Sequence, residues 1–280
     1  MPMNNRLLRP TSGVHPEAAA WRSAVVANGG SVSGSTLNAI STFCTAIDAA
    51  GIRDRFYRLN LFAGTGLNAA LVPLYLGPTY GGTTYGNTTD TNNGPFVSDD
   101  YNETGASAGL QGNGTNKWLA TGYPANTLPL ANSHIGTGLR TADTLASYRF
   151  ALAAYRVSSA CEFGLYTGVN GRKTACFGSY ATSTTFAGDT TDPTEVGNIM
   201  AAYPSVYRNG VAFGVNATTS KNYSDPDQIG VFCTLSEGAT PQQHTNSRMD
   251  WYSLGETMTS LQVAAFNSCI SAFQSALNRT

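Results

Sequence analysis

The sequence predicts a mainly β protein: a two-sheet antiparallel β-sandwich with N-terminal helices and one C-terminal helix. Three observations predict this fold. Helical periodicity covers residues 1–55, short apolar or alternating runs bounded by Gly, Asn and Thr follow from residue 56, and helical periodicity returns after Thr259. Because the helices are segregated from the strands, an antiparallel sheet is favoured over alternating βαβ units.

Two helices are expected before the first strand. Pro16 suits the start of the first helix, which continues over 17–26 with residues that favour helices. Ser35 is expected to cap the second helix, over 36–50, in which apolar residues recur at three- and four-residue steps. Gly51 is expected to end it.

Strands and turns occupy most of the remaining chain. Residues 77–116 form a Gly/Thr/Asn-rich stretch with little periodicity, in which loops with short strands are expected. Asn170-Gly171 and Asn209-Gly210 each separate two strand-like runs and predict type I′ hairpins. The expected strands lie at 56–62, 70–76, 147–156, 161–168, 173–180, 205–208, 211–215, 228–235 and 249–254.

The closing helix begins with a capping box, in which Thr259 and Gln262 satisfy each other's backbone amides. We divide the chain into an N-terminal arm and helical segment (1–55) and a sandwich domain with its closing helix (56–280); a single domain overall is the alternative. The expected core anchors are Phe43, Phe56, Phe150, Phe163, Phe213, Phe232 and Phe266.

Charged residues make up only 12% of the chain, against about 25% in soluble domains, and the net charge is −1. This composition is typical of proteins built into assemblies. Without a basic stripe, nucleic acid is not an expected partner, and without an apolar run of 18 residues no membrane span is expected. The N-terminus lacks the apolar stretch of a signal peptide, so we expect the chain either to stay in the cytoplasm where it is made or to leave by a route that needs no signal, such as release by lysis.

The cysteines do not suggest metal or disulfide chemistry. Their number is odd and no two are spaced as Cys-x-x-Cys, which is neither a zinc pattern nor a disulfide framework. Most are expected to be small buried apolar side chains. They are Cys44, Cys161, Cys176, Cys233 and Cys269.

Catalytic patterns are weak. No histidine lies next to a Gly-x-Ser-x-Gly elbow, so a Ser-His-Asp triad is not expected. Glycoside hydrolysis uses two carboxyl groups that flank the scissile bond, and no Glu-x-Asp-x-x-Glu strand is present. Asp250 and Glu256 are six residues apart on the penultimate segment. We therefore expect no enzyme and no organic cofactor.

Calcium is the one metal for which candidate ligands exist, because it prefers several oxygen ligands from a loop. Asp and Asn also populate turns for backbone reasons alone. Two further acidic groups, one at 189–195 and one at 225–227, are alternatives. The preferred candidate ligands are Asp90, Asn92, Asp99 and Asp100.

Four aromatic residues in or beside loops are candidates for stacking on sugar rings: Trp118, Tyr80, Tyr85 and Tyr101. Trp118 has a second interpretation, because residues 113–117 read as a turn that enters a strand. In that case its ring belongs to the core.

Three stretches resemble a known superfamily. The hairpin at 209–213 resembles the strand–Asn-Gly–strand hairpin of laminin G-like and pentraxin-like sandwiches, residues 250–263 resemble their last strand and closing helix, and residues 113–119 resemble their first strand. The chain thus resembles the concanavalin A-like lectin/glucanase superfamily, which implies a jelly roll. Residues 4–10 resemble the leaders of phage and phage-like structural proteins that carry such a sandwich. The superfamily's calcium ligands and catalytic carboxylates find no position-by-position match here.

The expected function is that of a non-enzymatic virion structural protein, a capsid decoration or tail-fibre component. Its expected partners are further copies of itself, other virion proteins and cell-surface glycans, and its expected location is the virion, outside the cell after release. A stand-alone lectin-like adhesin and a glycan hydrolase or lyase are the alternatives. The expected assembly arm consists of Arg6, Leu7, Leu8 and Arg9.

Overall fold

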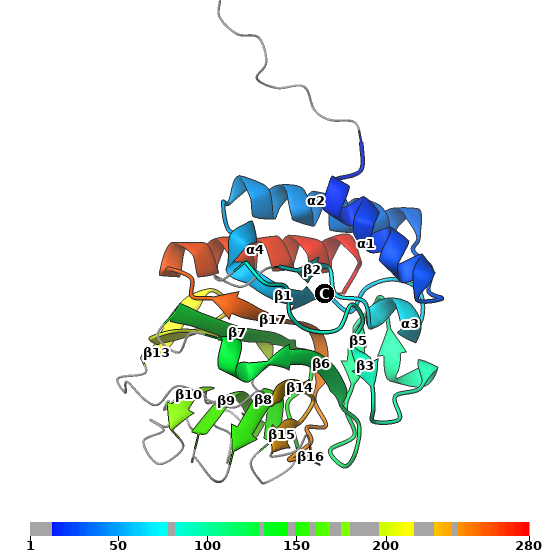
Figure 1. Cartoon of the computed structure of the whole chain (residues 1–280). Coiled ribbons are helices and arrows are strands. Elements are labelled where there is room, and N and C mark those ends of the chain that lie inside the picture. Colours follow the sequence, from blue (N-terminus) through cyan, green and yellow to red (C-terminus); the bar gives the residue numbers. More distant parts are fainter. Residues whose placement is uncertain are drawn as a thin grey trace, which may run out of the picture.

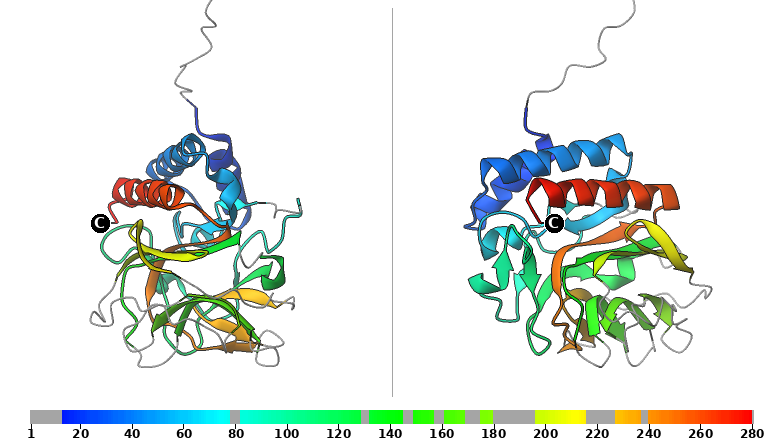
Figure 2. Two further views of the ribbon diagram at one scale, coloured as in Figure 1. Left: turned by 90° about the vertical axis from the view of Figure 1, so that its left-hand side faces the viewer. Right: turned by 180° about the vertical axis from the view of Figure 1, so that it is seen from behind.

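The computed structural model confirms a mainly β, two-sheet protein with helices from both ends of the chain (Figure 1). The helices lie together against one sheet, and the second sheet covers the opposite face of the first, so the molecule has three layers (Figure 2). The structure describes residues 13–77, 82–128, 132–144, 149–156, 161–168, 175–179, 196–215, 227–236 and 240–279.

The helical layer consists of α1 (Pro16–Ala27), α2 (Gly34–Ala49) and α4 (Ser260–Ala276). The expected capping box at the start of α4 is confirmed. Ser33, rather than Ser35, caps α2: its Oγ accepts from the Thr36 amide at 3.0 Å. Gly51 follows α2 with a φ of 65°, a left-handed conformation that glycine adopts without strain. None of the helices in the described ranges is long and apolar enough to cross a membrane.

The first sheet has the order β13-β12-β11-β7-β17-β1-β2, and β5 pairs with both β17 and β4. All of its described pairings are antiparallel. Its strands are β1 (Phe56–Asn60), β2 (Tyr75–Leu76), β4 (Tyr101–Asn102), β5 (Gly109–Gln111), β7 (Ser133–Leu139), β11 (Gly197–Ala202), β12 (Ser205–Arg208), β13 (Val211–Val215) and β17 (Arg248–Glu256).

The second sheet has the order β10-β9-β8-β14-β6-β3, with β15 beside β8 and β16 beside β15. Its described pairings are antiparallel except that of β15 with β8. Its strands are β3 (Thr91–Asn92), β6 (Leu119–Pro124), β8 (Arg149–Arg156), β9 (Cys161–Gly168), β10 (Ala175–Ser179), β14 (Gln228–Val231), β15 (Thr234–Ser236) and β16 (Thr240–Gln242).

The hairpin expected at Asn209-Gly210 is confirmed. These residues join β12 to β13 with φ values of 50° and 80°, and both positive values are required by a type I′ turn. The strands on either side of Asn170-Gly171, β9 and β10, also pair. That turn itself lies outside the described residues.

Other expectations were wrong. The strand expected at 70–76 is instead the short helix α3 (Leu67–Ala70) followed by β2, and the run at 228–235 is divided by Phe232, whose φ is 69°. Sequence reasoning also missed β7 and β11, which lie in the middle of the first sheet. Both are buried on their two faces over most of their length, so neither shows an alternation of apolar and polar residues.

Two apolar clusters hold the three layers together. One lies between the sheets, and the other lies between the first sheet and the helices. In the second cluster, Phe266 of α4 packs edge-on against Trp251 of β17, with ring centroids 5.3 Å apart. All of the expected core anchors are buried except Phe213, which is half-buried and packs against the inter-sheet cluster.

A charged group also lies between the sheets. Arg58 of β1 is fully buried, and its Nη2 donates to Asp90 Oδ1 at 2.6 Å. Tyr252 of β17 donates its hydroxyl to the same carboxylate, and Asn60 Nδ2 donates to Asp90 Oδ2 at 2.8 Å. A β-bulge between Phe56 and Arg58 turns the guanidinium toward this side of the sheet. The buried guanidinium and carboxylate therefore neutralise each other, and further hydrogen bonds satisfy their remaining polar atoms, as burial requires.

Replacing Asp90 with Asn should lower the free energy of unfolding by about 3 kcal/mol, because it leaves the Arg58 cation buried without a counter-charge. Urea denaturation measures the change. Asp99→Asn is the matched control, since Asp99 is exposed, and it should change stability by less than about 0.5 kcal/mol. Equal effects from the two variants would contradict this account of the buried pair.

Candidate functional site

A pocket of about 450 Å³ lies between the C-terminal half of α4 and the ends of β7, β11 and β17. Its walls bring together segments that are far apart in the sequence. Its described lining residues are Ala106, Gly138, Leu139, Arg140, Val196, Gly197, Asn198, Asn209, Asp250, Ser271, Gln274 and Ser275.

Asp250 is the acid among these lining residues, and a β-bulge places it there. The pairing of β17 with β7 shifts between Met249 and Trp251. Met249 belongs to the inter-sheet core and Trp251 to the helix-facing core, so the strand changes its alternation at this point. Gly138 of β7 pairs with Trp251, and a Cβ at Gly138 would overlap both the Asp250 carboxylate and the Trp251 indole. Glycine is therefore needed at position 138 for the carboxylate to fit.

The pocket contains buried polar atoms without partners. Among the described residues, Asp250 Oδ1 and Gln274 Nε2 have no hydrogen-bond partner, although the two residues are only 3% and 6% exposed. Asp250 Oδ2 lies 3.7 Å from Arg140 Nε. Buried polar groups are normally satisfied by protein, water or a ligand. The pocket thus presents one free acceptor and one free amide donor beside a guanidinium.

Burial raises the pKa of Asp250 to about 6, and the nearby Arg279 and Arg140 oppose this rise. Arg279 is itself fully buried beneath the C-terminal end of α4, where its Nη2 donates to the Phe62 carbonyl at 2.8 Å. The Asp250 carboxyl therefore lies near two guanidinium groups, those of Arg279 and Arg140, and the Arg279 group is held in place by its hydrogen bond to a backbone carbonyl.

The far wall of the pocket is held by asparagine side chains. Asn198 Oδ1 accepts from Trp251 Nε1 at 2.8 Å, and Asn198 Nδ2 donates to Asn267 Oδ1 of α4 at 2.8 Å. Asn209 Oδ1 accepts from the Asn198 amide at 2.9 Å. These bonds connect β11, β17, α4 and the Asn-Gly turn and fix the orientation of the asparagine side chains.

Chemically, this arrangement suits a small neutral ligand with several hydroxyl groups. A hydroxyl both donates and accepts, and it can therefore bridge Asp250 Oδ1 and the Gln274 amide while Arg140 donates to a neighbouring oxygen. Sequence reasoning considered Asp250 only together with Glu256, as one of two carboxyl groups for glycoside hydrolysis. Arg140 and Gln274 were missed, because no spacing in the sequence connects them to it.

The aromatic residues expected to contact sugars lie elsewhere. Trp118 is buried with Ala120, Cys233 and Leu235, as the alternative interpretation of its turn predicted. Tyr101 is 6% exposed, and its hydroxyl lies 3.0 Å from the Phe62 carbonyl. Neither ring presents a face to solvent, so the expectation of exposed rings was wrong for both.

The other two candidate rings differ from these. Tyr85 is half-buried and packs edge-on against Tyr123, with ring centroids 6.1 Å apart. Tyr80 lies outside the described residues.

The expected calcium ligands do not converge on one point. Asp90 is the buried partner of Arg58, while the Asn92 side chain bonds the backbone of Phe96 through both its oxygen and its nitrogen. Asp100 pairs with Lys117 at 2.5 Å and accepts from the Val97 amide, and Asp99 is exposed. Three of the four side chains bind other protein groups, and the three acids do not meet at one point, which contradicts the expected calcium site.

Two further sets of sequence candidates cannot be placed. The arm residues Arg6, Leu7, Leu8 and Arg9 lie outside the described residues, as do the acidic residues at 189–195 and Asp225.

A second concave surface lies on the helical layer, where the described chain begins. It is an apolar groove of about 410 Å³ between α1 and α2. Val14 and Val26 are 43% and 60% exposed there. The groove is lined by Val14, Ala19, Arg22, Ser23, Val26 and Leu37.

Comparisons with known proteins give only distant similarities. No protein-family profile and no curated protein matches the sequence. A solved structure of Trypanosoma rangeli sialidase aligns with 82% of this chain and 38% of its own, at 10% identity and a TM-score of 0.46. The NanB sialidase of Streptococcus pneumoniae aligns with 52% of this chain and 27% of its own, at 11% identity and a TM-score of 0.37. The chain spans well under half the length of either structure.

The raised pKa of Asp250 predicts a specific pH dependence of stability. Because the folded pKa of about 6 exceeds the ordinary value of 3.8, the native state binds this proton more tightly than the unfolded state does. The stabilisation is therefore complete below pH 3.8 and is lost as pH rises through 6. Relative to Asp250→Asn, which cannot titrate, the wild type should lose about 3 kcal/mol over that range.

Urea denaturation of both proteins across this pH range measures the difference, in which contributions from other titrating groups cancel. A difference in unfolding free energy that does not change with pH would refute the account of a buried Asp250 carboxyl with a raised pKa.

Proposed function

We propose that this chain is a non-enzymatic structural protein of a virus particle, a capsid decoration or tail-fibre component, that binds further copies of itself and other virion proteins. The observation that carries this proposal is the apolar groove between α1 and α2. Exposed apolar side chains gathered in a concave surface mark protein-binding sites more often than single exposed valines do.

Composition supports an assembly role for this surface. Only 12% of the residues are charged, so two copies meet with little repulsion and with few long charged side chains to immobilise. Arg22 is the charged residue among the described residues of the groove. An apolar groove with one cation suits a partner segment that is mainly apolar.

The sequence before the groove supplies a docking element. Arg9 precedes Val14 by five residues, which span at most about 18 Å when extended. The arm Arg6, Leu7, Leu8 and Arg9 therefore starts within reach of the groove and combines apolar and basic side chains. Its resemblance to phage leaders supports the same role. The protein would then be made in the host cytoplasm and act outside the cell after release.

Deleting residues 1–12 should abolish incorporation into particles and leave the fold intact, because the two apolar clusters that hold the layers together are built from residues after position 17. Val26→Asp should weaken self-association in light-scattering measurements at least tenfold, since it places a carboxylate in the apolar groove. Leu261→Asp is the matched control: Leu261 is 82% exposed on α4 and lies away from the groove.

Normal incorporation of the truncated chain would contradict the role of the arm. Equal self-association of the two aspartate variants would contradict the role of the groove. Circular dichroism of each variant checks that its fold is retained.

A second candidate function, glycan attachment, is favoured by the pocket beneath α4. Asp250 Oδ1 and Gln274 Nε2 are buried and unpartnered there, which is the polar pattern that sugar hydroxyl groups satisfy. Binding is favoured over hydrolysis, because Asp250 is the acid among the described lining residues and glycoside hydrolysis uses a pair of carboxyl groups.

Glycan arrays with the full chain test this second function. Any bound glycan should lose at least tenfold in affinity with Asp250→Ala and with Gln274→Ala, and should keep its affinity with Tyr85→Ala, whose ring lies outside the pocket. An array without hits would count against glycan binding. Loss of affinity only with Tyr85→Ala would move the sugar site to the loop at 82–90.

A further inference from the structure

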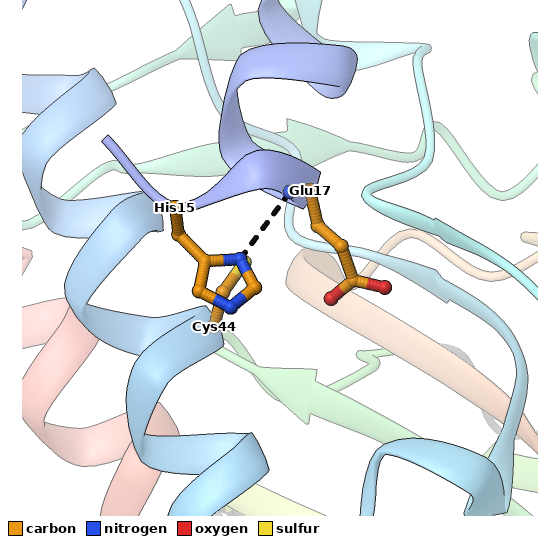
Figure 3. A group of neighbouring side chains, drawn as sticks. All are labelled: His15, Glu17 and Cys44. Atoms are coloured by element: carbon orange, nitrogen blue, oxygen red, sulfur yellow. Dashed lines mark hydrogen bonds between the residues drawn. The ribbon is translucent and has the colours of Figure 1, made fainter. Parts of the chain in front are cut away.

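Three metal-ligating side chains meet where α1 begins against α2. One ligand atom from each of His15, Glu17 and Cys44 lies within 4.8 Å of the others (Figure 3). Within the described ranges, no other group of three His, Cys, Asp or Glu side chains meets this criterion. Sequence spacing had excluded zinc, because no Cys-x-x-Cys occurs, but here the ligands come from two different helices.

Local structure explains why the two α1 ligands lie together. His15 is the N-cap of α1 and precedes Pro16, so its backbone is extended, with a ψ of 137°. Glu17 lies two residues later in the first helical turn. Cys44 comes from the buried face of α2, which packs against α1. The packing of the two helices thus brings the thiol to the start of α1.

His15 could bind a metal through Nδ1 by giving up one long hydrogen bond. Its Nε2 lies 3.0 Å from Asp48 Oδ2, and its Nδ1 accepts only a long bond of 3.3 Å from the Glu17 amide. In the neutral imidazole, a proton on Nε2 leaves the lone pair on Nδ1. A histidine that ligates a metal usually donates its other N–H to a carboxylate in this way.

Glu17 is oriented in a similar manner. Arg53 Nε donates to its Oε1 at 2.5 Å, while Oε2 is shielded from solvent and has no hydrogen-bond partner. Arg53 is itself placed by stacking on the Tyr75 ring, 3.8 Å from its centroid. One carboxylate oxygen is therefore held by the guanidinium, and the other is buried without a hydrogen-bond partner.

Cys44 is fully buried, and this burial raises the pKa of its thiol to about 12. Its sulfur lies within 4.8 Å of the His15 and Glu17 ligand atoms, so it is the third donor of the cluster.

We propose that His15, Glu17 and Cys44 bind a zinc ion, with Asp48 and Arg53 orienting two of the ligands. Imidazole, thiolate and carboxylate together are a donor set that zinc accepts, whereas calcium and magnesium prefer oxygen alone. One thiolate and one carboxylate neutralise the dication. Donor atoms around tetrahedral zinc are about 3.5 Å apart, and these atoms lie within 4.8 Å of one another, so the side chains need to close by about 1.3 Å at most. The fourth position remains for water.

The consequence of such a site is a crosslink between α1 and α2 at the point where the chain enters the domain. The ion would fix the residues directly after the arm and beside the groove. Because the ligands differ from the lining residues of the groove, zinc binding and self-association can fail independently.

The test uses the full chain, dialysed against a chelator and then titrated with Zn²⁺ or Co²⁺. One equivalent of Zn²⁺ should bind and raise the Tm, and Co²⁺ should give a thiolate-to-cobalt charge-transfer band in the near ultraviolet. Cys44→Ser should abolish the band. Cys269→Ser should keep it, since Cys269 is a cysteine of the same helical core outside the cluster.

Two further variants keep the test decisive if Cys44→Ser does not fold. His15→Asn retains a good N-cap residue and removes the imidazole, and Glu17→Gln removes the carboxylate with little change in shape. Each should weaken Zn²⁺ binding at least tenfold, with the fold verified by circular dichroism. A folded wild type without the cobalt band, or a band that persists in Cys44→Ser, would overturn the proposal.

Discussion

The first sheet is buried on both faces, and the rest of the structure depends on this constraint. Its inner face packs against the second sheet, and its outer face packs against α1, α2 and α4. A sheet between two apolar layers must fit large rings on both sides at the packing density of a protein interior. In β7, Ile135 and Leu139 fill the inter-sheet side, while Gly136 and Gly138 face the Trp251 ring. Glycines in this central strand therefore follow from the tryptophan that the helices cover.

The same two-sided burial explains where the buried charges lie. Each of the two bulges described above, one in β1 and one in β17, turns a charged side chain out of regular alternation. Arg58 finds a full set of partners between the sheets, and Asp250 does not on the helical side. A satisfied buried ion pair contributes to a single well-defined fold, whereas an unsatisfied carboxyl is a common feature of functional pockets. The contrast between these two sites is why the pocket, and not the Asp90 loop, is the stronger ligand candidate.

The helical layer carries the remaining proposals. It closes the outer face of the first sheet, supplies Gln274 to the pocket, and forms the groove at the start of the chain. The proposed zinc cluster lies inside this layer, between the groove and the core. A helical cover tied at its N-terminal end would hold the groove in a fixed orientation, as the proposed docking function requires.

The sequence by itself determined the fold class, the three long helices, the Thr259 capping box, the Asn209-Gly210 hairpin and most of the aromatic core, because each depends on local periodicity or on a turn that only certain residues adopt. It did not reveal β7 and β11, since strands buried on both faces lose the alternation by which strands are recognised.

The sequence by itself could not find either site. Asp250, Arg140 and Gln274, like His15, Glu17 and Cys44, come together only when helices pack on the sheet, and no sequence spacing encodes that contact. For Asp90 the sequence pattern suggested a site that the tertiary structure does not form. Asp90 has the sequence pattern of a calcium ligand, but its carboxylate pairs with Arg58, because a buried guanidinium needs a counter-charge.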